Sequence, residues 1–264
     1  MSITNPVFSS RLKTLATLGA ALFVSAGVAA QTVVDQTAAA QTAEPQAWRT
    51  QLTPYVWMTG LQGYIQPVSG APTVHVDKSF SDVLENLDAA FFVSGSARKD
   101  RWVLHGDFSH ASTSDGASLP LGLSARAKVR QSSLTLTGGY NWQLAPQSSV
   151  DLMGGVRLWD IHAHVQVPGV AAAQSNTSFV DPVVAVRWRY DLGSQWSSLL
   201  YADAGGFGLG SDATWQALAS INYQWRDNIY LSLGYRHLSV DYRSGGKRLD
   251  FSQSGPLLGV TLKY

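Results

Sequence analysis

The sequence predicts an all-β fold, an antiparallel transmembrane β-barrel of about ten strands. Apolar and polar residues alternate with a period of two nearly everywhere after Trp48, as expected of strands with one apolar face. The apolar face of strand after strand ends in aromatic residues, and the chain has 9 Trp and 10 Tyr but only 14% charged residues. Barrels of eight or twelve strands are the alternatives to ten.

Residues 213–225 (ATWQALASINYQW) show the pattern most clearly. The odd positions are apolar, with Trp215 and Trp225 near the two ends, and the even positions are almost all polar. A soluble sandwich would bury such a face in its core and accept rings anywhere along it. A membrane barrel turns the face to lipid and places rings at the two water interfaces. Because ten tilted residues cover roughly the hydrocarbon thickness, we prefer the barrel.

The first 30 residues have the order of regions found in secretory signal peptides. Arg11 and Lys13 precede an apolar run over 15–26, and small residues follow before Gln31. We therefore expect a signal peptide at 1–30, a disordered leader rich in Ala, Gln and Thr at 31–47, and the barrel at 48–264. An uncleaved anchor is the alternative, but the apolar run is short for a membrane span. The expected location is the cell outer membrane.

Connection lengths predict the strand count and the orientation. Short links fall at 97–102, 144–149, 191–196 and 224–229, and longer or Gly-rich segments fall at 112–120, 167–176, 207–212 and 244–247. Bacterial outer-membrane barrels keep short turns in the periplasm and longer loops outside. The strands expected between these links are 50–65, 88–99, 101–113, 121–143, 148–166, 174–191, 196–207, 213–226, 228–243 and 248–264.

One segment, residues 79–88 (SFSDVLENLD), has helical rather than strand spacing. Its apolar residues recur three and four positions apart, and Ser81 is a candidate N-cap before Glu85. The segment follows a predicted small hairpin through PVSGAPTV (67–74) and falls in the first external loop. A short helix there either folds into the barrel mouth as a partial plug or lies on the surface of the loop.

Several segments resemble a widespread group of small outer-membrane β-barrel proteins of Gram-negative bacteria, within the OmpA-like barrel superfamily. They are LTPYVWMTGLQG (52–63), FSDVLENLDAAFF (80–92), GGFGLGSDATWQ (205–216), LGYRHLSVDYRSG (233–245) and GPLLGVTLKY (255–264). The resemblance covers about residues 48–264 and implies an outer-membrane barrel, in a group whose role is mostly undetermined. The chain ends in Tyr264, where the group most often has Phe.

The alternation also predicts which charged residues face the lumen. They are Arg98, His105, Asp107, Asp151, Arg157, Asp181, Arg187, Asp203 and Arg236. Both signs occur in similar numbers, and a barrel of about ten strands has a narrow interior. We therefore expect Arg/Asp pairs that occlude the lumen of a structural barrel, with a narrow, porin-like channel for small solutes as the alternative. No cofactor is expected.

A second group of charges falls on the lipid-facing register. Arg126, Lys128 and Arg130 follow the same parity as Leu134 and Leu136, so they stack on the outer face just beyond the hydrocarbon. Arg forks and Lys charges bind phosphate, which the outer leaflet carries on lipopolysaccharide. The residues are candidates for binding a lipid headgroup, and a solvated basic edge is the alternative.

The sequence gives little support to catalysis, metal binding or nucleic-acid binding. His110 and Ser112 share the lipid-side parity near the outer interface, as a lipid-modifying hydrolase would require, but no H-E-x-x-H or G-x-S-x-G context accompanies them. His162 and His164 are more typical of polar strand ends than of a metal site. Cys is absent, and the net charge of +1 lacks the basic excess of nucleic-acid binders. The chain is expected to be a non-enzymatic monomer whose partners are outer-membrane lipid, lipopolysaccharide and, during biogenesis, the barrel assembly machinery.

Overall fold

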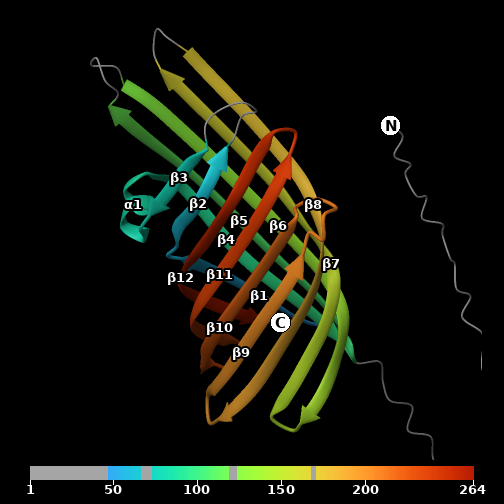
Figure 1. Cartoon of the computed structure of the whole chain (residues 1–264). Coiled ribbons are helices and arrows are strands. Elements are labelled where there is room, and N and C mark those ends of the chain that lie inside the picture. Colours follow the sequence, from blue (N-terminus) through green and yellow to red (C-terminus); the bar gives the residue numbers. More distant parts are fainter. Residues whose placement is uncertain (1–46, 67–72, 119–123, 168–170) are drawn as a thin grey trace, which may run out of the picture. The chain divides into compact units, whose positions relative to one another are not determined.

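The computed structural model describes residues 47–66, 73–118, 124–167 and 171–264 (Figure 1). The predicted signal peptide (1–30) and almost all of the predicted leader (31–47) lie outside these residues. The elements are β1 (Arg49–Trp57), β2 (Gly60–Gln66), β3 (Val74–Lys78), α1 (Phe80–Glu85), β4 (Leu87–Lys99), β5 (Trp102–Ser118), β6 (Ser124–Ala145), β7 (Ser148–Val167), β8 (Ala171–Gly193), β9 (Trp196–Gly205), β10 (Ala213–Arg226), β11 (Ile229–Ser244) and β12 (Lys247–Lys263). Within the described ranges, no helix has the length and apolar character needed to cross a bilayer.

Ten of the strands close into an antiparallel barrel. The order runs from β1 through β4 to β12, and β12 pairs with β1 to close the sheet. The closing seam extends from Gln51 opposite Lys263 to Trp57 opposite Leu257. Closure satisfies the backbone hydrogen bonds of every strand without leaving an edge in the membrane. The predicted fold class and strand count are confirmed.

The two ends of the barrel differ. Two-residue turns join β4 to β5, β6 to β7, β8 to β9 and β10 to β11, and they lie at the same end as the start of β1 and the end of β12. We call this the turn end and the opposite end the loop end. At the loop end, Gly245 and Gly246 also form a two-residue turn, in the positive-φ conformations that hairpin turns require. The assignment of the turn end to the periplasm stays a prediction.

The outer surface of the barrel is apolar, as a membrane-spanning surface must be. Side chains on the outer register are exposed although they are apolar: Trp215 is 46% and Trp225 56% exposed, whereas the inward Gln216 is 4% exposed. Aromatic residues gather toward the turn end at Trp48, Trp102, Tyr140, Trp142, Trp188, Trp196 and Trp225. Between the interfaces the exposed residues are mostly aliphatic, such as Leu136, Leu152, Val184, Leu200 and Leu258. This reversal of soluble-protein burial identifies an integral outer-membrane barrel.

The first predicted strand, 50–65, is divided in two. β1 pairs with β4. After Met58 and Thr59 the chain leaves β4, and β2 pairs with β12 on one side and with β3 on the other. The bend passes close to β12, where a Cβ atom on Gly255 would lie 1.9 Å from the Met58 carbonyl oxygen. Gly is therefore required where the two backbones meet. The predicted hairpin is formed by β2 and β3, although its tip lies outside the described residues.

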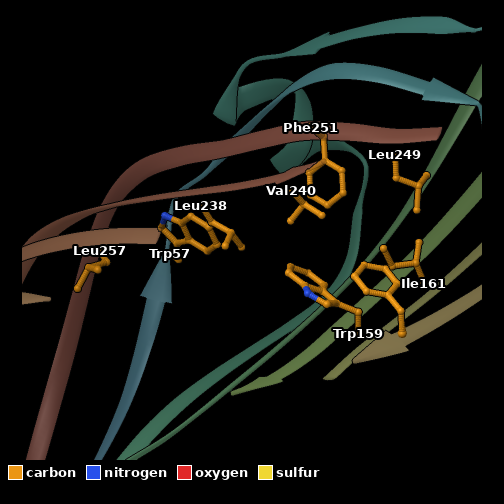
Figure 2. Packing of buried hydrophobic residues seen from close by; sticks show 9 residues of the cluster. Trp57, Trp159, Ile161, Leu238, Val240, Leu249, Phe251 and Leu257 are labelled. Atoms are coloured by element: carbon orange, nitrogen blue, oxygen red, sulfur yellow. The ribbon is translucent and has the colours of Figure 1, made fainter. Parts of the chain in front are cut away.

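At the loop end, apolar side chains from strands that are not neighbours in the sheet pack together inside the barrel. Trp159, Ile161 and Phe179 on β7 and β8 pack against residues of β1, β11 and β12 in one buried hydrophobic core (Figure 2). The facing residues are Trp57, Leu238, Val240, Leu249, Phe251 and Leu257. The rings of Trp159 and Phe251 meet edge to face at 6.4 Å, and those of Phe179 and Tyr242 stack at 4.3 Å. This hydrophobic core fills the inside of the barrel at the loop end.

The structure corrects the helix cap and several strand ends, and it decides between the two positions left open for the helix. Helix α1 starts at Phe80 because Ser79, not Ser81, is its N-cap: Ser79 and Asp82 form a reciprocal capping box. The helix has no buried residue and lies beside β2 and β3, so it does not plug the barrel (Figure 1). β5, β7 and β8 also extend farther than expected, through most of the segments predicted as loops at 112–120 and 167–176.

Candidate functional site

The residues predicted to face the lumen all lie on the inner face of the barrel. Asp151, Arg157, Asp181, Arg187 and Arg236 have side chains at most 3% exposed. Asp107 and Asp203 are buried, and the side chain of Arg98 is 19% exposed. His105 lines a cavity at the turn end of the lumen. Since charges are costly to bury without partners, the contacts of each group decide what the lumen can do.

Asp151 organises the charges nearest the turn end. Its carboxylate accepts hydrogen bonds from Arg98 at 2.8 Å, from Arg187 at 2.8 Å and from Arg189 at 2.9 and 3.0 Å. Asn141 donates a further bond at 2.7 Å. Three guanidinium groups therefore share one carboxylate, and this cluster carries excess positive charge. The sequence analysis missed Arg189, although it has the parity of Arg187 on β8.

Two ion pairs form the next layer of the lumen. Arg157 donates to Asp203 at 2.6 Å and is also held by hydroxyls of Thr135 and Thr214. Arg236 donates to Asp107 at 3.1 Å and to the Tyr55 hydroxyl, which in turn donates to Asp107 at 2.9 Å. The Arg236 guanidinium also lies 4.6 Å from the Trp57 ring centroid, so the ion-pair layer adjoins the hydrophobic core.

Asp181 does not have the arginine partner that the sequence analysis expected. Within the described residues its carboxylate forms no ion pair; it accepts a bond from the backbone N–H of Ser211 at 2.6 Å and from the Trp159 indole at 3.2 Å. Ser211 belongs to the loop that follows β9 and is fully buried. Asp181 therefore holds this loop against β8 at the loop end.

A cavity of about 410 Å³ occupies the lumen at the turn end. Its inner end is formed by His105, Asp107, Arg187, Tyr201 and Arg236, and its mouth by residues of the turns and strand ends such as Gln147, Gln195 and Lys263. Ser, Thr, Asn and Gln side chains make up much of the wall between them. The cavity is therefore polar, and its inner end adjoins the ion-pair layer.

The hydrophobic core beyond that layer was not foreseen, although the sequence carries a signal for it. Along β11 the apolar residues are odd-numbered up to Tyr235 and even-numbered from Leu238. Along β7 they change from even to odd between Leu158 and Trp159. Because side chains alternate strictly between faces, such a change moves the apolar face from the outside of the barrel to the inside.

The predicted cationic ladder lies on the outer face of β6, beyond the apolar band. Lys128 forms an ion pair with Asp88 at 2.9 Å. Arg126 and Arg130 have no ion-pair partner within the described part of the chain, and both are exposed. Arg130 lies opposite Ser112 of β5 and His162 of β7 in the sheet register. The ladder therefore presents two unneutralised guanidinium groups.

The histidines on this face do not form a catalytic relay. His110 contacts the hydroxyl of Ser132 at 2.9 Å, and Ser112 donates to Asp88 at 3.1 Å, so Ser112 and His110 have different partners. His162, on the part of β7 that projects beyond the apolar band, contacts Asn176 at 2.8 Å and Asp160 at 2.9 Å. The Asn176 and Asp160 acceptors raise the pKa of His162. No group of ligands suited to a metal ion occurs among the described residues.

Comparisons with known proteins find similarity in structure alone. No protein-family model matches the chain, and a search of curated proteins finds no match. The chain is similar in structure to the outer membrane protease OmpT from Escherichia coli, with 10% identity, a TM-score of 0.49 and coverage of 84% of this chain and 98% of that one. The translocator domain of the autotransporter NalP from Neisseria meningitidis has 10% identity and a TM-score of 0.48, with coverage of 84% of this chain and 90% of that one. The attachment invasion locus protein Ail of Yersinia pestis has 12% identity and a TM-score of 0.36, with coverage of 82% of this chain and 98% of that one. Such distant likeness carries no information about activity.

Proposed function

We propose that this chain is a closed, non-conducting outer-membrane barrel with a structural role. One observation carries the proposal: the lumen contains two successive barriers, the ion-pair layer around Arg157 and Arg236 and the hydrophobic core around Trp159 and Phe251. Neither barrier depends on a loop that could swing aside, because both are built from strand residues.

The two barriers oppose passage for different physical reasons. In the ion-pair layer, Arg157 and Asp203 have side chains no more than 1% exposed, and a permeating ion would have to separate them. Breaking a buried pair typically costs about 3–5 kcal/mol. The hydrophobic core offers a permeating ion no polar ligand, and apolar constrictions block conduction by excluding water. Together they support a closed lumen over a narrow channel.

Planar-bilayer recording of the refolded protein tests the proposal. We expect no current steps under conditions in which an open porin, the positive control for the assay, conducts. Reproducible unitary steps would instead support the narrow channel. The same preparation should leave lipopolysaccharide chemically unchanged, and a modified lipid would support a lipid-modifying enzyme.

A second candidate function is contact with the phosphates of lipopolysaccharide through the cationic ladder. It is supported by the exposure of Arg126 and Arg130 beyond the apolar band without acidic partners among the described residues. Lys128 contributes less in this scheme because Asp88 already neutralises it. Bidentate contacts from two Arg side chains suit a phosphorylated headgroup, and binding should weaken with added salt.

The test is lipopolysaccharide co-purification with variants. Arg126→Gln combined with Arg130→Gln should lower the amount retained, whereas Lys128→Gln should have a smaller effect. Arg101→Gln, in an exposed turn at the opposite end of the barrel, is the matched control. Undiminished retention by the folded double variant would leave the ladder as a solvated basic edge.

A further inference from the structure

The wall of the cavity at the turn end contains three arginine residues, Arg187, Arg189 and Arg236. Arg187 and Arg189 line it, while Asp151, to which both donate, is fully buried and does not line it. Arg98 donates to the same carboxylate from the other side. The single negative charge thus lies behind the guanidinium groups, and the surface that faces the cavity is cationic.

The remaining charges of the cavity wall do not offset this excess. Asp107 is already paired with Arg236. Asp191 lies at the exposed mouth, where it accepts a bond from the backbone of Gly193 at 2.9 Å. Lys263 adds a further positive charge at the mouth. Among the described residues, the Asp151 cluster therefore retains an excess of two positive charges, and Arg187 and Arg189 present guanidinium groups of this cluster to the cavity.

Two buried polar groups at the inner end have unused hydrogen-bonding capacity that suits an anion. The Nη2 atom of Arg187 and the hydroxyl of Tyr201 are buried and have no hydrogen-bond partner in the described part of the chain. Arg187 is 3% and Tyr201 6% exposed, and both line the cavity. Buried donors of this kind cost free energy unless a partner reaches them.

We propose that this cavity, whose wall includes Arg187, Arg189 and Tyr201, is a binding site for a small oxyanion that enters from the turn end. A carboxylate or phosphate group accepts from the guanidinium forks and the Tyr201 hydroxyl, and it balances the excess charge around Asp151. The volume of about 410 Å³ exceeds that of a single inorganic ion and falls within the range of small-molecule sites. Hydroxyl and amide side chains of the wall suit a ligand with further polar groups.

Calorimetric titration of the full-length, refolded barrel in lipid nanodiscs tests the site. Inorganic phosphate and citrate are the probes at constant ionic strength, and glycerol is the uncharged control. We expect saturable binding of at least one anion and none of glycerol, with the stronger of the two anions indicating a phosphate-bearing or a carboxylate-bearing ligand. No saturation by either anion up to about 10 mM would overturn the proposal.

Variants locate the binding. Arg189→Gln removes a partly exposed cation and should weaken binding at least about tenfold, the loss of one or two charge-assisted hydrogen bonds. Tyr201→Phe should weaken it less, because only one neutral donor is lost. Arg101→Gln, an exposed turn residue that does not line the cavity, should bind as the wild type does. Equal affinity of the wild type and folded Arg189→Gln would refute the site.

The outcome is independent of the closed lumen proposed above. Anion binding together with current steps would refute closure and leave the site intact. A silent barrel without saturable anion binding would refute the site and leave closure intact.

Discussion

Replacing Ala219 and Ser220 by Arg, one at a time, tests the assignment of the two faces of the barrel wall. The residues are neighbours on β10, but Ala219 is exposed on the outer register and Ser220 lines the turn-end cavity. A strand rises about 3.3 Å per residue, and a tilt near 45° reduces this to about 2.3 Å along the membrane normal. Ala219 therefore lies about 9 Å from the level of Trp215 and about 14 Å from that of Trp225, close to the bilayer midplane.

An Arg side chain at this depth on the lipid face costs about 2–4 kcal/mol of unfolding free energy. At Ser220 the same side chain enters a polar cavity, and we expect a cost below about 1 kcal/mol. Equilibrium denaturation in phospholipid vesicles, followed by tryptophan fluorescence, measures both values. Equal tolerance of the two substitutions would refute the assignment of the faces, and a greater cost at Ser220 would reverse it.

Three further predictions concern the interior and the loop end. Arg157→Met should lower the unfolding free energy by about 3–5 kcal/mol because it leaves Asp203 buried without its cation, and adding Asp203→Leu should recover much of that loss in the same denaturation assay. The loop end should lose stability as the pH rises through the raised pKa of His162, since the hydrogen bonds to Asn176 and Asp160 favour the charged imidazole, and His162→Gln should remove this dependence in the same assay. Trp159 is 2% exposed and Trp215 is 46% exposed, so lipids with brominated acyl chains should quench the fluorescence of Trp215 but not that of Trp159. The contribution of each tryptophan is the difference in fluorescence between the wild type and the Trp215→Phe or Trp159→Phe variant.

The strands of the barrel could be predicted because the membrane-facing segment of each strand keeps one apolar, outward face. Trp215 and Trp225 mark the interfaces of β10, and the two-residue turns follow from short polar links between alternating segments. The helix was predicted in the right segment, but its N-cap was wrong because Ser79 and Ser81 are both plausible caps in the sequence. In the structure the backbone of Ser79 is extended and its hydroxyl accepts a hydrogen bond from the Asp82 backbone N–H.

The candidate sites were harder to predict because they depend on which inner residues meet across the lumen. Parity placed Arg157 and Asp203 inside, but it does not pair them, since the two lie on β7 and β9, which are separated by β8. For the same reason Asp181 was expected to have a cation and instead binds the buried Ser211 backbone. The excess positive charge around Asp151 arises because residues of β4, β7 and β8 meet there. The sequence pattern within one strand does not show which residues of other strands it will contact.

Along β7, β11 and β12 the apolar side chains change from the outer to the inner face of the sheet. This change allows one sheet to contact lipid along part of its outer face and water along the rest. On β12, Leu258 and Val260 face outward to lipid, whereas Leu249 and Phe251 face inward to the core. Where the membrane ends, water takes the place of lipid outside, and the sheet lowers its free energy by turning its apolar side chains toward each other. The position of the change therefore marks the upper boundary of the hydrocarbon. Beyond that boundary the polar outer face is free to carry Arg126, Arg130 and His162, while the apolar residues pack together inside the barrel.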